Sequence, residues 1–156
     1  MTPGTDRYLE SFARFERVTG GSGQGWLRPV RQAAIARFAE LGFPTIRDED
    51  WRFTNVAPIA QAAFAPANGS RIELSPRDIA QFAVPGLVGT QLVFVNGRYA
   101  PRLSSPGRLS DGATVSSLAQ AFTDSRTMLE PHLARYADYA RDGFTALNTA
   151  FMEDGG

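Results

Sequence analysis

Few residues in this chain have side chains suited to catalysis or metal binding. His132 is the only histidine among the 156 residues, and the sequence contains no cysteine. A serine hydrolase needs an imidazole base, and most protein-bound metals are held by cysteine, histidine or carboxylate side chains. His132 is therefore the one candidate for a hydrolase base or an imidazole ligand, although a lone histidine beside Leu133 on a helix is usually structural.

Two pairs of acidic residues are the other candidates, Asp48 with Asp50 and Glu153 with Asp154. Both pairs fall on predicted loops or helix ends, where an acidic side chain is ordinarily solvated. The sequence has no metal-ligand spacing, nucleophile elbow or phosphate loop, and it has no lysine for Schiff-base chemistry. We therefore predict no catalytic, metal-binding or cofactor-binding residue in this chain, and no enzyme activity.

Composition and charge exclude several classes of partner. Sixteen basic and sixteen acidic residues cancel, so the chain lacks the basic surface typical of nucleic-acid binding. No apolar run approaches the roughly 20 residues that a membrane-spanning helix needs, and no secretory signal is visible, which predicts a cytoplasmic location and no membrane partner. A hydrophobic content of 43% with eleven phenylalanines predicts a single folded domain with a substantial core.

The candidate anchor residues lie in the stretch from Phe43 to Ile59, around which we expect the other elements to gather. An acidic run leads to Glu49 and then to Trp51, Arg52 and Phe53, in a segment predicted to be extended or turning. Large aromatic side chains are usually buried, so Trp51 and Phe53 are predicted to be core or inter-helix anchors. The alternative is a surface that contacts a partner, because tryptophan and arginine are enriched at interface hot spots.

Amphipathic helices are expected on both sides of this stretch. Apolar residues spaced by three and four predict a helix over 6–18, and Pro29 and Gly42 mark the start and end of a second helix that should pack against the first. The intervening GGSGQG, residues 20–25, follows a helix and not a strand, so it is predicted to be a flexible connector and not a dinucleotide-binding loop.

The second half of the sequence combines helices with a short β-hairpin. Residues 91–95 and 98–100 flank Asn96-Gly97, the preferred dipeptide of a two-residue hairpin turn. Further short strands are predicted over 71–74 and 114–117. Helices are predicted over 76–82 with an N-cap at Ser75, over 118–122 and 128–141, and in the last segment from a cap at Asp142 to a stop at Gly155, with a helical turn or two within 56–67. The sequence therefore predicts a mainly helical α+β fold in which amphipathic helices pack with a short β-hairpin.

Four stretches of the sequence, in order, resemble the SufB/SufD family of the SUF iron-sulfur cluster assembly system. The first is Pro44-Thr45 followed by Glu49-x-Trp51-Arg52-Phe53-Thr54, and the second is LVFVNGRYAPRLSS at 92–105. The third surrounds His132 and Leu133, and the fourth is FTALNTAFMEDGG at 144–156. The resemblance is to the N-terminal region of SufD-like subunits and extends from about Val30 onward.

This resemblance implies that residues 1–156 form the N-terminal domain of a SufD-like protein and are a fragment, with the β-helix and C-terminal domains of the family absent. It implies a non-catalytic structural or protein-interaction domain of a scaffold subunit, with SufB-like and SufC-like subunits as partners contacted mostly outside this chain. The complex that it resembles handles iron-sulfur clusters and reduced flavin. We expect no cofactor in this chain itself, because clusters are ligated mainly by cysteine.

Two other functions are open at this point. The chain could be a free-standing helical adaptor that binds a protein through the Trp51 segment, or a small hydrolase that uses His132 as its base. The hydrolase is the weaker alternative, because nothing else in the sequence completes a catalytic arrangement.

Overall fold

The computed structural model describes residues 4–19, 24–64, 67, 73–86, 88–107 and 109–155. The chain divides into two compact units, which we call unit 1 and unit 2. Unit 1 comprises Met1–Pro66 and Ser125–Met152, and unit 2 comprises Ala67–Asp124 and Glu153–Gly156. Most of the predicted connector at 20–25, and half of the predicted strand at 71–74, lie outside the described residues.

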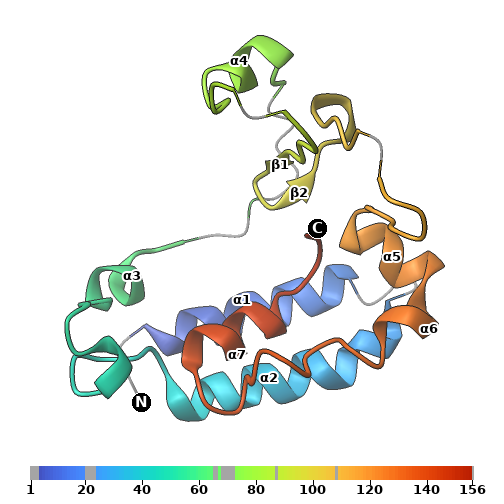
Figure 1. Cartoon of the computed structure of the whole chain (residues 1–156). Coiled ribbons are helices and arrows are strands. Elements are labelled where there is room, and N and C mark those ends of the chain that lie inside the picture. The colour runs from blue at the N-terminus through green and yellow to red at the C-terminus, as the bar shows by residue number, and fades with distance from the viewer. Residues whose placement is uncertain are drawn as a thin grey trace. The chain divides into compact units, whose positions relative to one another are not determined.

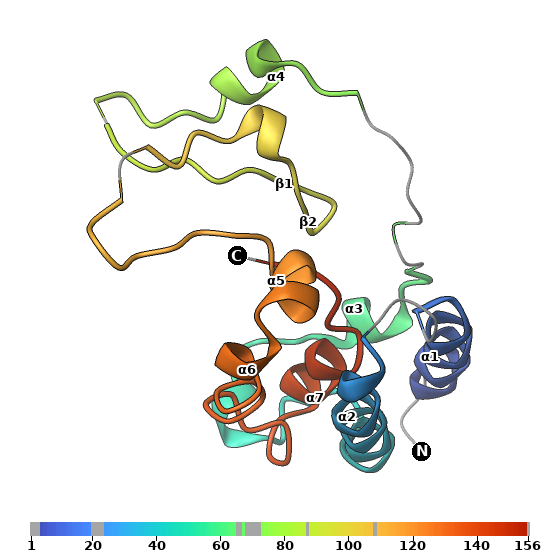
Figure 2. The same cartoon turned by 90° about the vertical axis from the view of Figure 1, so that its right-hand side faces the viewer.

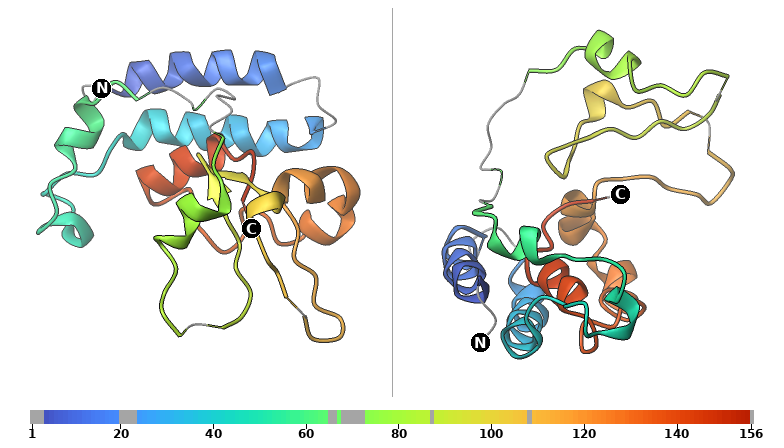
Figure 3. Two further views of the ribbon diagram at one scale, coloured as in Figure 1. Left: turned by 90° about the horizontal axis from the view of Figure 1, so that it is seen from above. Right: turned by 90° about the vertical axis from the view of Figure 1, so that its left-hand side faces the viewer.

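Unit 1 is helical. Its elements are α1 (Thr5–Thr19), η1 (Gly25–Leu27), α2 (Arg28–Leu41), η2 (Glu49–Trp51), α3 (Ala57–Gln61), α6 (Arg126–Leu129) and α7 (Gly143–Ala150), shown in Figure 1. Helices α1, α2 and α7 lie side by side, as Figures 1 and 3 both show. Helix α2 packs most extensively along α7 and also packs along α1, which confirms the predicted pairing of the first two helices.

Helix α2 has the boundaries that its sequence predicts. Pro29 lies in the first turn, where its missing N–H costs no hydrogen bond. Gly42 ends the helix with φ of 65°, and its N–H donates to the carbonyl oxygen of Phe38 at 2.8 Å. A positive φ is readily adopted only by glycine, so the stop at Gly42 is set locally.

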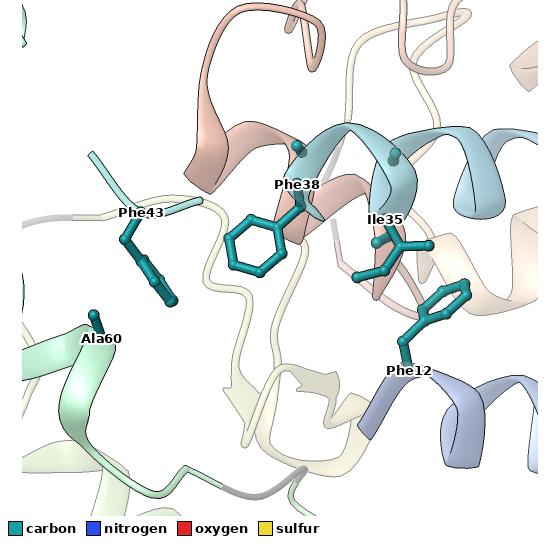
Figure 4. Packing of buried hydrophobic residues seen from close by; sticks show 8 residues of the cluster. Phe12, Ile35, Phe38, Phe43 and Ala60 are labelled. Atoms are coloured by element: carbon teal, nitrogen blue, oxygen red, sulfur yellow. The ribbon is translucent and has the colours of Figure 1, made fainter. Parts of the chain in front are cut away.

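One cluster of apolar side chains forms the core of unit 1. Its buried members come from four helices and the loop after α2, and they are Phe12, Ala34, Ile35, Phe38, Phe43, Ala60, Ala146 and Ala150. Phe38 is fully buried and meets Phe43 edge-on, with ring centroids 5.2 Å apart. Figure 4 shows these two rings close to each other, with Ile35 and Phe12 further along α2 and α1. Burying one such side chain contributes about 1.5–3 kcal/mol.

The start of α7 depends on an N-cap at Asp142 and on the close approach of Gly143 to the backbone of Gly42. Asp142 caps the helix as predicted, because its Oδ1 accepts from the Thr145 N–H at 2.7 Å and from the Thr145 hydroxyl at 2.9 Å. A Cβ at Gly143 would meet the backbone carbonyl of Gly42, so only glycine fits there. The helix ends at Ala150, earlier than the stop predicted at Gly155.

The prediction of one helix over 128–141 is wrong. Helix α6 ends at Leu129, and a series of turns occupies most of the chain from Glu130 to Arg141. Ala134 has φ of 55°, a left-handed conformation that cannot continue a right-handed helix. Pro131 also lacks an N–H for the helical hydrogen bond, so the apolar spacing in this segment does not produce a helix.

Unit 2 contains the predicted hairpin. Its elements are α4 (Pro76–Ala80), β1 (Phe94–Val95), β2 (Arg98–Tyr99), η3 (Pro101–Leu103) and α5 (Leu118–Asp124), and Figure 2 shows the long loops that join them. The strands pair antiparallel in the register Phe94↔Tyr99 and Val95↔Arg98. Asn96 and Gly97 both have positive φ, 51° and 78°, as a type I′ turn requires. The hairpin is confirmed, but its strands are shorter than predicted.

Two further predictions for unit 2 have opposite outcomes. Helix α4 begins with the predicted cap, a reciprocal capping box between Ser75 and Asp78. The strand predicted over 114–117 is wrong, because these residues form an irregular segment that leads into α5. The described residues contain seven α-helices and one two-stranded sheet, so the prediction of a mainly helical α+β fold is confirmed.

Candidate protein-interaction site

The segment from Thr45 to Thr54 is a series of hydrogen-bonded turns. The Asp48 carboxylate accepts from the N–H of Thr45 at 2.7 Å and from its hydroxyl at 3.1 Å. The Trp51 N–H donates to the Asp48 carbonyl and the Thr54 N–H to the Trp51 carbonyl, both at 2.9 Å. These bonds close successive turns, so the backbone that carries the predicted anchor residues has a defined conformation.

Trp51 attaches this segment to α7. Its side chain is half-buried, and its ring centroid lies 5.2 Å from that of Phe144, with the ring planes tilted by 42°. Phe144 also meets Phe43 edge-on at 5.4 Å, which links Trp51 to the core cluster. Trp51 therefore lies at the edge of the core of unit 1, and the expectation that the other elements gather around it is wrong, because α2 occupies the centre.

Phe53 lies on the surface, contrary to the prediction that it is a core anchor. Its side chain is 92% exposed, and it lies in the turn that follows η2. The Arg52 guanidinium lies 5.3 Å from the centroid of the Phe53 ring. Arg52 also forms an ion pair with Glu49 at 3.7 Å, and both side chains are largely exposed. Of the four candidate residues, only Trp51 contacts the core.

His132 is exposed and does not belong to a cluster of ligands or catalytic groups. Its Nδ1 lies 3.1 Å from the Tyr136 hydroxyl, and the two rings stack at a centroid distance of 6.1 Å. Within the described ranges, no group of three or more histidine, aspartate and glutamate side chains could hold a metal ion. The geometry around His132 is that of a surface ring pair.

Sequence reasoning missed the most connected polar group in unit 2, the carboxylate of Asp154. Its Oδ1 accepts from the Gly155 N–H at 2.8 Å, the Ser117 hydroxyl at 2.9 Å and the Ala119 N–H at 3.1 Å. Its Oδ2 accepts from the Tyr99 N–H at 2.9 Å. One side chain thus joins β2 of the hairpin, the first turn of α5 and the segment after α7, so the description of Asp154 as solvated charge is wrong.

The environment of Asp154 also sets its charge state. Partial burial raises the pKa of this carboxyl, but hydrogen bonds from the backbone of Tyr99, Ala119 and Gly155 and from the Ser117 hydroxyl outweigh burial and lower the pKa. The neighbouring Glu153 forms an ion pair with Arg98 of β2 at 2.7 Å. The sequence signal for this role of Asp154 is the Asp-Gly pair at the end of the fourth stretch, which entered the sequence analysis only as part of the family motif.

A second missed residue is Arg31, which is 3% exposed on α2. Its guanidinium donates to the Met152 carbonyl from Nε at 3.1 Å and from Nη2 at 2.7 Å, and Nη2 also donates to the Gln24 side chain at 2.8 Å. The guanidinium carbon lies 5.1 Å from the centroid of the Phe15 ring. Arg31 thus ties the chain after α7 to α2 within unit 1.

The described residues form a mainly helical α+β structure in two units, and polar side chains hold segments of backbone together within each unit. Residues 3–156 match the SufBD protein N-terminal region, and the chain belongs to this family. It is 29% identical over 149 residues to an iron-sulfur cluster assembly SufBD family protein of Synechocystis sp., and that match covers 96% of this chain and 32% of the relative. No solved structure matches the chain.

A second relative is the iron-sulfur cluster assembly protein SufD of Escherichia coli, which is 33% identical over 76 residues. That match covers 49% of this chain and 17% of the relative. The chain therefore spans about a third of the length of the Synechocystis relative. None of the helices in the described part of the chain is long and apolar enough to cross a membrane.

Proposed function

We propose that this chain is a non-catalytic structural and protein-interaction domain of a scaffold subunit that takes part in iron-sulfur cluster assembly. The observation that carries the proposal is the match of residues 3–156 to the SufBD N-terminal region, together with two relatives that are named for cluster assembly. Because the sequence has no cysteine, we propose that the cluster is ligated by residues outside this sequence. The partners that we propose are SufB-like and SufC-like subunits.

The hairpin of unit 2 supports a structural role. Phe94 and Tyr99 face each other as a non-hydrogen-bonded pair, because the Ala100 N–H bonds the Val93 carbonyl and the Tyr99 N–H points away from β1 to Asp154. The backbone N–H and C=O of Phe94 therefore point to the opposite, outer edge of the hairpin. An isolated two-stranded hairpin is marginally stable in water, so this edge suits another strand.

Exposed apolar side chains elsewhere in unit 2 support the same role. Unit 2 leaves Phe82, Val84 and Val88 between 64% and 96% exposed. We propose that, in longer members of the family, unit 2 packs against the polypeptide that follows the N-terminal region, and that the hairpin caps or extends a β-helix there.

Hydrogen exchange of the Phe94 amide tests this packing. The amide should exchange at least about tenfold more slowly when the chain is expressed with the coding sequence that follows Gly156 than in the 156-residue chain alone. The Tyr99 amide, which already donates to Asp154, is the internal control. Equal exchange of the Phe94 amide in both proteins would contradict the capping role, and a stop codon directly after Gly156 would favour the adaptor described next.

The second candidate function is a free-standing adaptor, which the exposure of Phe53 favours. An adaptor would bind its partner without SufB-like or SufC-like subunits, whereas the scaffold domain would co-purify with them. Activity assays on His132→Ala test the remaining alternative, and an unchanged activity in this variant would eliminate the hydrolase.

A further inference from the structure

The two edges of the hairpin in unit 2 differ in what they offer to another strand. On the β2 edge, the outward N–H of Tyr99 donates to the Asp154 carboxylate at 2.9 Å. The next outward position is Pro101, which has no N–H, and Arg98 of the same strand forms an ion pair with Glu153. Proline, charge and a covering group are the features by which proteins block a sheet edge, so the β2 edge is closed to a further strand.

The other edge, which we call the β1 edge, runs along 91–95 and has none of these features. Gln91 and Val93 both form backbone hydrogen bonds with the returning segment of the hairpin, at 2.8–2.9 Å. Leu92 and Phe94 alternate with them and therefore point their N–H and C=O groups outward. Neither N–H has an acceptor among the described residues. Residues 86–97 contain no charged side chain and no proline, so nothing in the sequence of the β1 edge blocks a strand.

The outward groups of the β1 edge are complementary to those of a second copy. When two β1 edges pair antiparallel with Val93 opposite Val93, Leu92 of each copy lies opposite Phe94 of the other. Both residues point their backbone groups toward the other copy, so each pair exchanges its N–H and C=O groups across a two-fold axis. Leu92 is half-buried and Phe94 is 37% exposed, and an apolar cross-strand pair of this kind stabilises a sheet.

We propose that two copies of the 156-residue chain associate through their β1 edges and join the two hairpins into one antiparallel sheet. An isolated hairpin is marginally stable in water, and added strands stabilise it. A second copy is the occupant whose own open edge is satisfied in the same step. The edge is uncharged and the net charge of the chain is zero, so two copies do not repel each other. The closed β2 edges lie at the two sides of the joined sheet and prevent the addition of further copies.

This inference does not rest on the proposed function, because it concerns the 156-residue chain by itself. In longer members of the family, a strand from the polypeptide that follows the N-terminal region would compete for the same edge. Hydrogen exchange in the longer and shorter proteins must therefore be compared in dilute solution, where the 156-residue chain is a monomer.

Sedimentation equilibrium of the 156-residue chain and two variants tests the proposal. The wild-type chain should show a monomer–dimer equilibrium without larger species. Leu92→Pro removes an outward N–H and no hydrogen bond within the hairpin. It should dimerise about tenfold or more weakly than Leu92→Ala, the matched control, which loses the same side chain and keeps the N–H. The Tyr99 amide, which donates to Asp154, should exchange equally in both variants and so report that the hairpin is intact.

A measurement on the unaltered chain keeps the test valid if Leu92→Pro fails to fold. Protection of the Phe94 amide from hydrogen exchange should increase with protein concentration, in step with the fraction of dimer. Protection of the Tyr99 amide should not change, because its acceptor lies within the same chain.

Three outcomes would overturn the inference. A chain that stays monomeric, with exchange at Phe94 independent of concentration, would exclude a second copy and leave the proposed function intact. Equal dimerisation of Leu92→Pro and Leu92→Ala, with the hairpin intact in both, would show that association uses another surface. Species larger than a dimer would contradict the closed β2 edges.

Discussion

The two units differ in the contacts that join their segments. In unit 1, four helices and the loop after α2, which carries Phe43, contribute to one apolar cluster around Phe38, and the rings of Tyr8 and Phe144 extend it. In unit 2, the buried apolar residues among those described are Val93, Ala121 and Phe122.

The segments of unit 2 are joined instead by hydrogen bonds to the Asp154 carboxylate and by the ion pair of Arg98 with Glu153. Apolar burial scales with area and is insensitive to pH, whereas a carboxylate contact is directional and depends on ionisation. The two units should therefore respond to different perturbations.

The largest effect is expected from Phe38→Ala in the core of unit 1. Phe38 is fully buried and contacts Tyr8 and Phe43 edge-on, so truncation leaves a cavity among aromatic rings. The free energy of unfolding should fall by about 3–5 kcal/mol, measured by urea denaturation. A loss of less than about 1 kcal/mol in the free energy of unfolding would contradict the central role of α2.

Gly143→Ala should be the next most severe change. The added methyl group would meet the Gly42 carbonyl, which is backbone and cannot move without shifting the end of α2. We expect a loss of about 1–3 kcal/mol in the free energy of unfolding. Alanine in place of the exposed Gly25, where nothing lies near the added Cβ, is the control and should be close to neutral.

Asp154→Asn should destabilise unit 2 and leave unit 1 unaffected. An amide offers one acceptor oxygen, so its NH₂ group would face either the Tyr99 N–H or the donors from Ser117 and Ala119. The loss should be about 1–2 kcal/mol, seen as faster hydrogen exchange at Tyr99. If hydrogen exchange in α2 accelerated as much as exchange at Tyr99, the two units would unfold together.

Acidification should act on unit 2 first. The pKa of Asp154 in the folded chain is lowered below its ordinary value, so its contribution to stability is present above the ordinary value and is lost as pH falls through the folded pKa. The Tyr99 amide should therefore lose protection from hydrogen exchange once the pH is below about 4, which is near the pKa of an aspartate in the unfolded chain. In Asp154→Asn this part of the pH dependence should disappear.

The smallest effect is expected from Val88→Ser in unit 2. Val88 is 96% exposed, so the substitution removes almost no buried apolar area. The free energy of unfolding should change by less than about 0.5 kcal/mol. A larger loss in the isolated chain would mean that unit 2 buries more apolar surface in solution than the described contacts provide.

Much of unit 1 could be predicted because the signals act over a few residues. Pro29 and Gly42 bound α2, and Asp142 caps α7, through contacts within one turn. The segment over 128–141 shows the limit of such signals. Its apolar spacing suits a helix, but Pro131 and the left-handed backbone at Ala134 produce turns.

The candidate site was predicted only in part. Trp51 and Phe53 are similar in character and two positions apart, yet Trp51 contacts Phe144 and Phe53 is exposed. Which ring faces inward depends on the turn after η2 and on the position of α7, more than 90 residues further along the chain. Spacing along the sequence carries no such information.

Local signals in the sequence set both boundaries of α2, the start of α7, the Asn96-Gly97 turn and the mainly helical α+β class, because capping groups and turn dipeptides act on their immediate neighbours. Tertiary packing, in contrast, makes α7 the main partner of α2 and brings donors from β2 and from the start of α5 to the Asp154 carboxylate. Those contacts join residues that are 35 or more positions apart, and folding alone brings them within hydrogen-bonding distance.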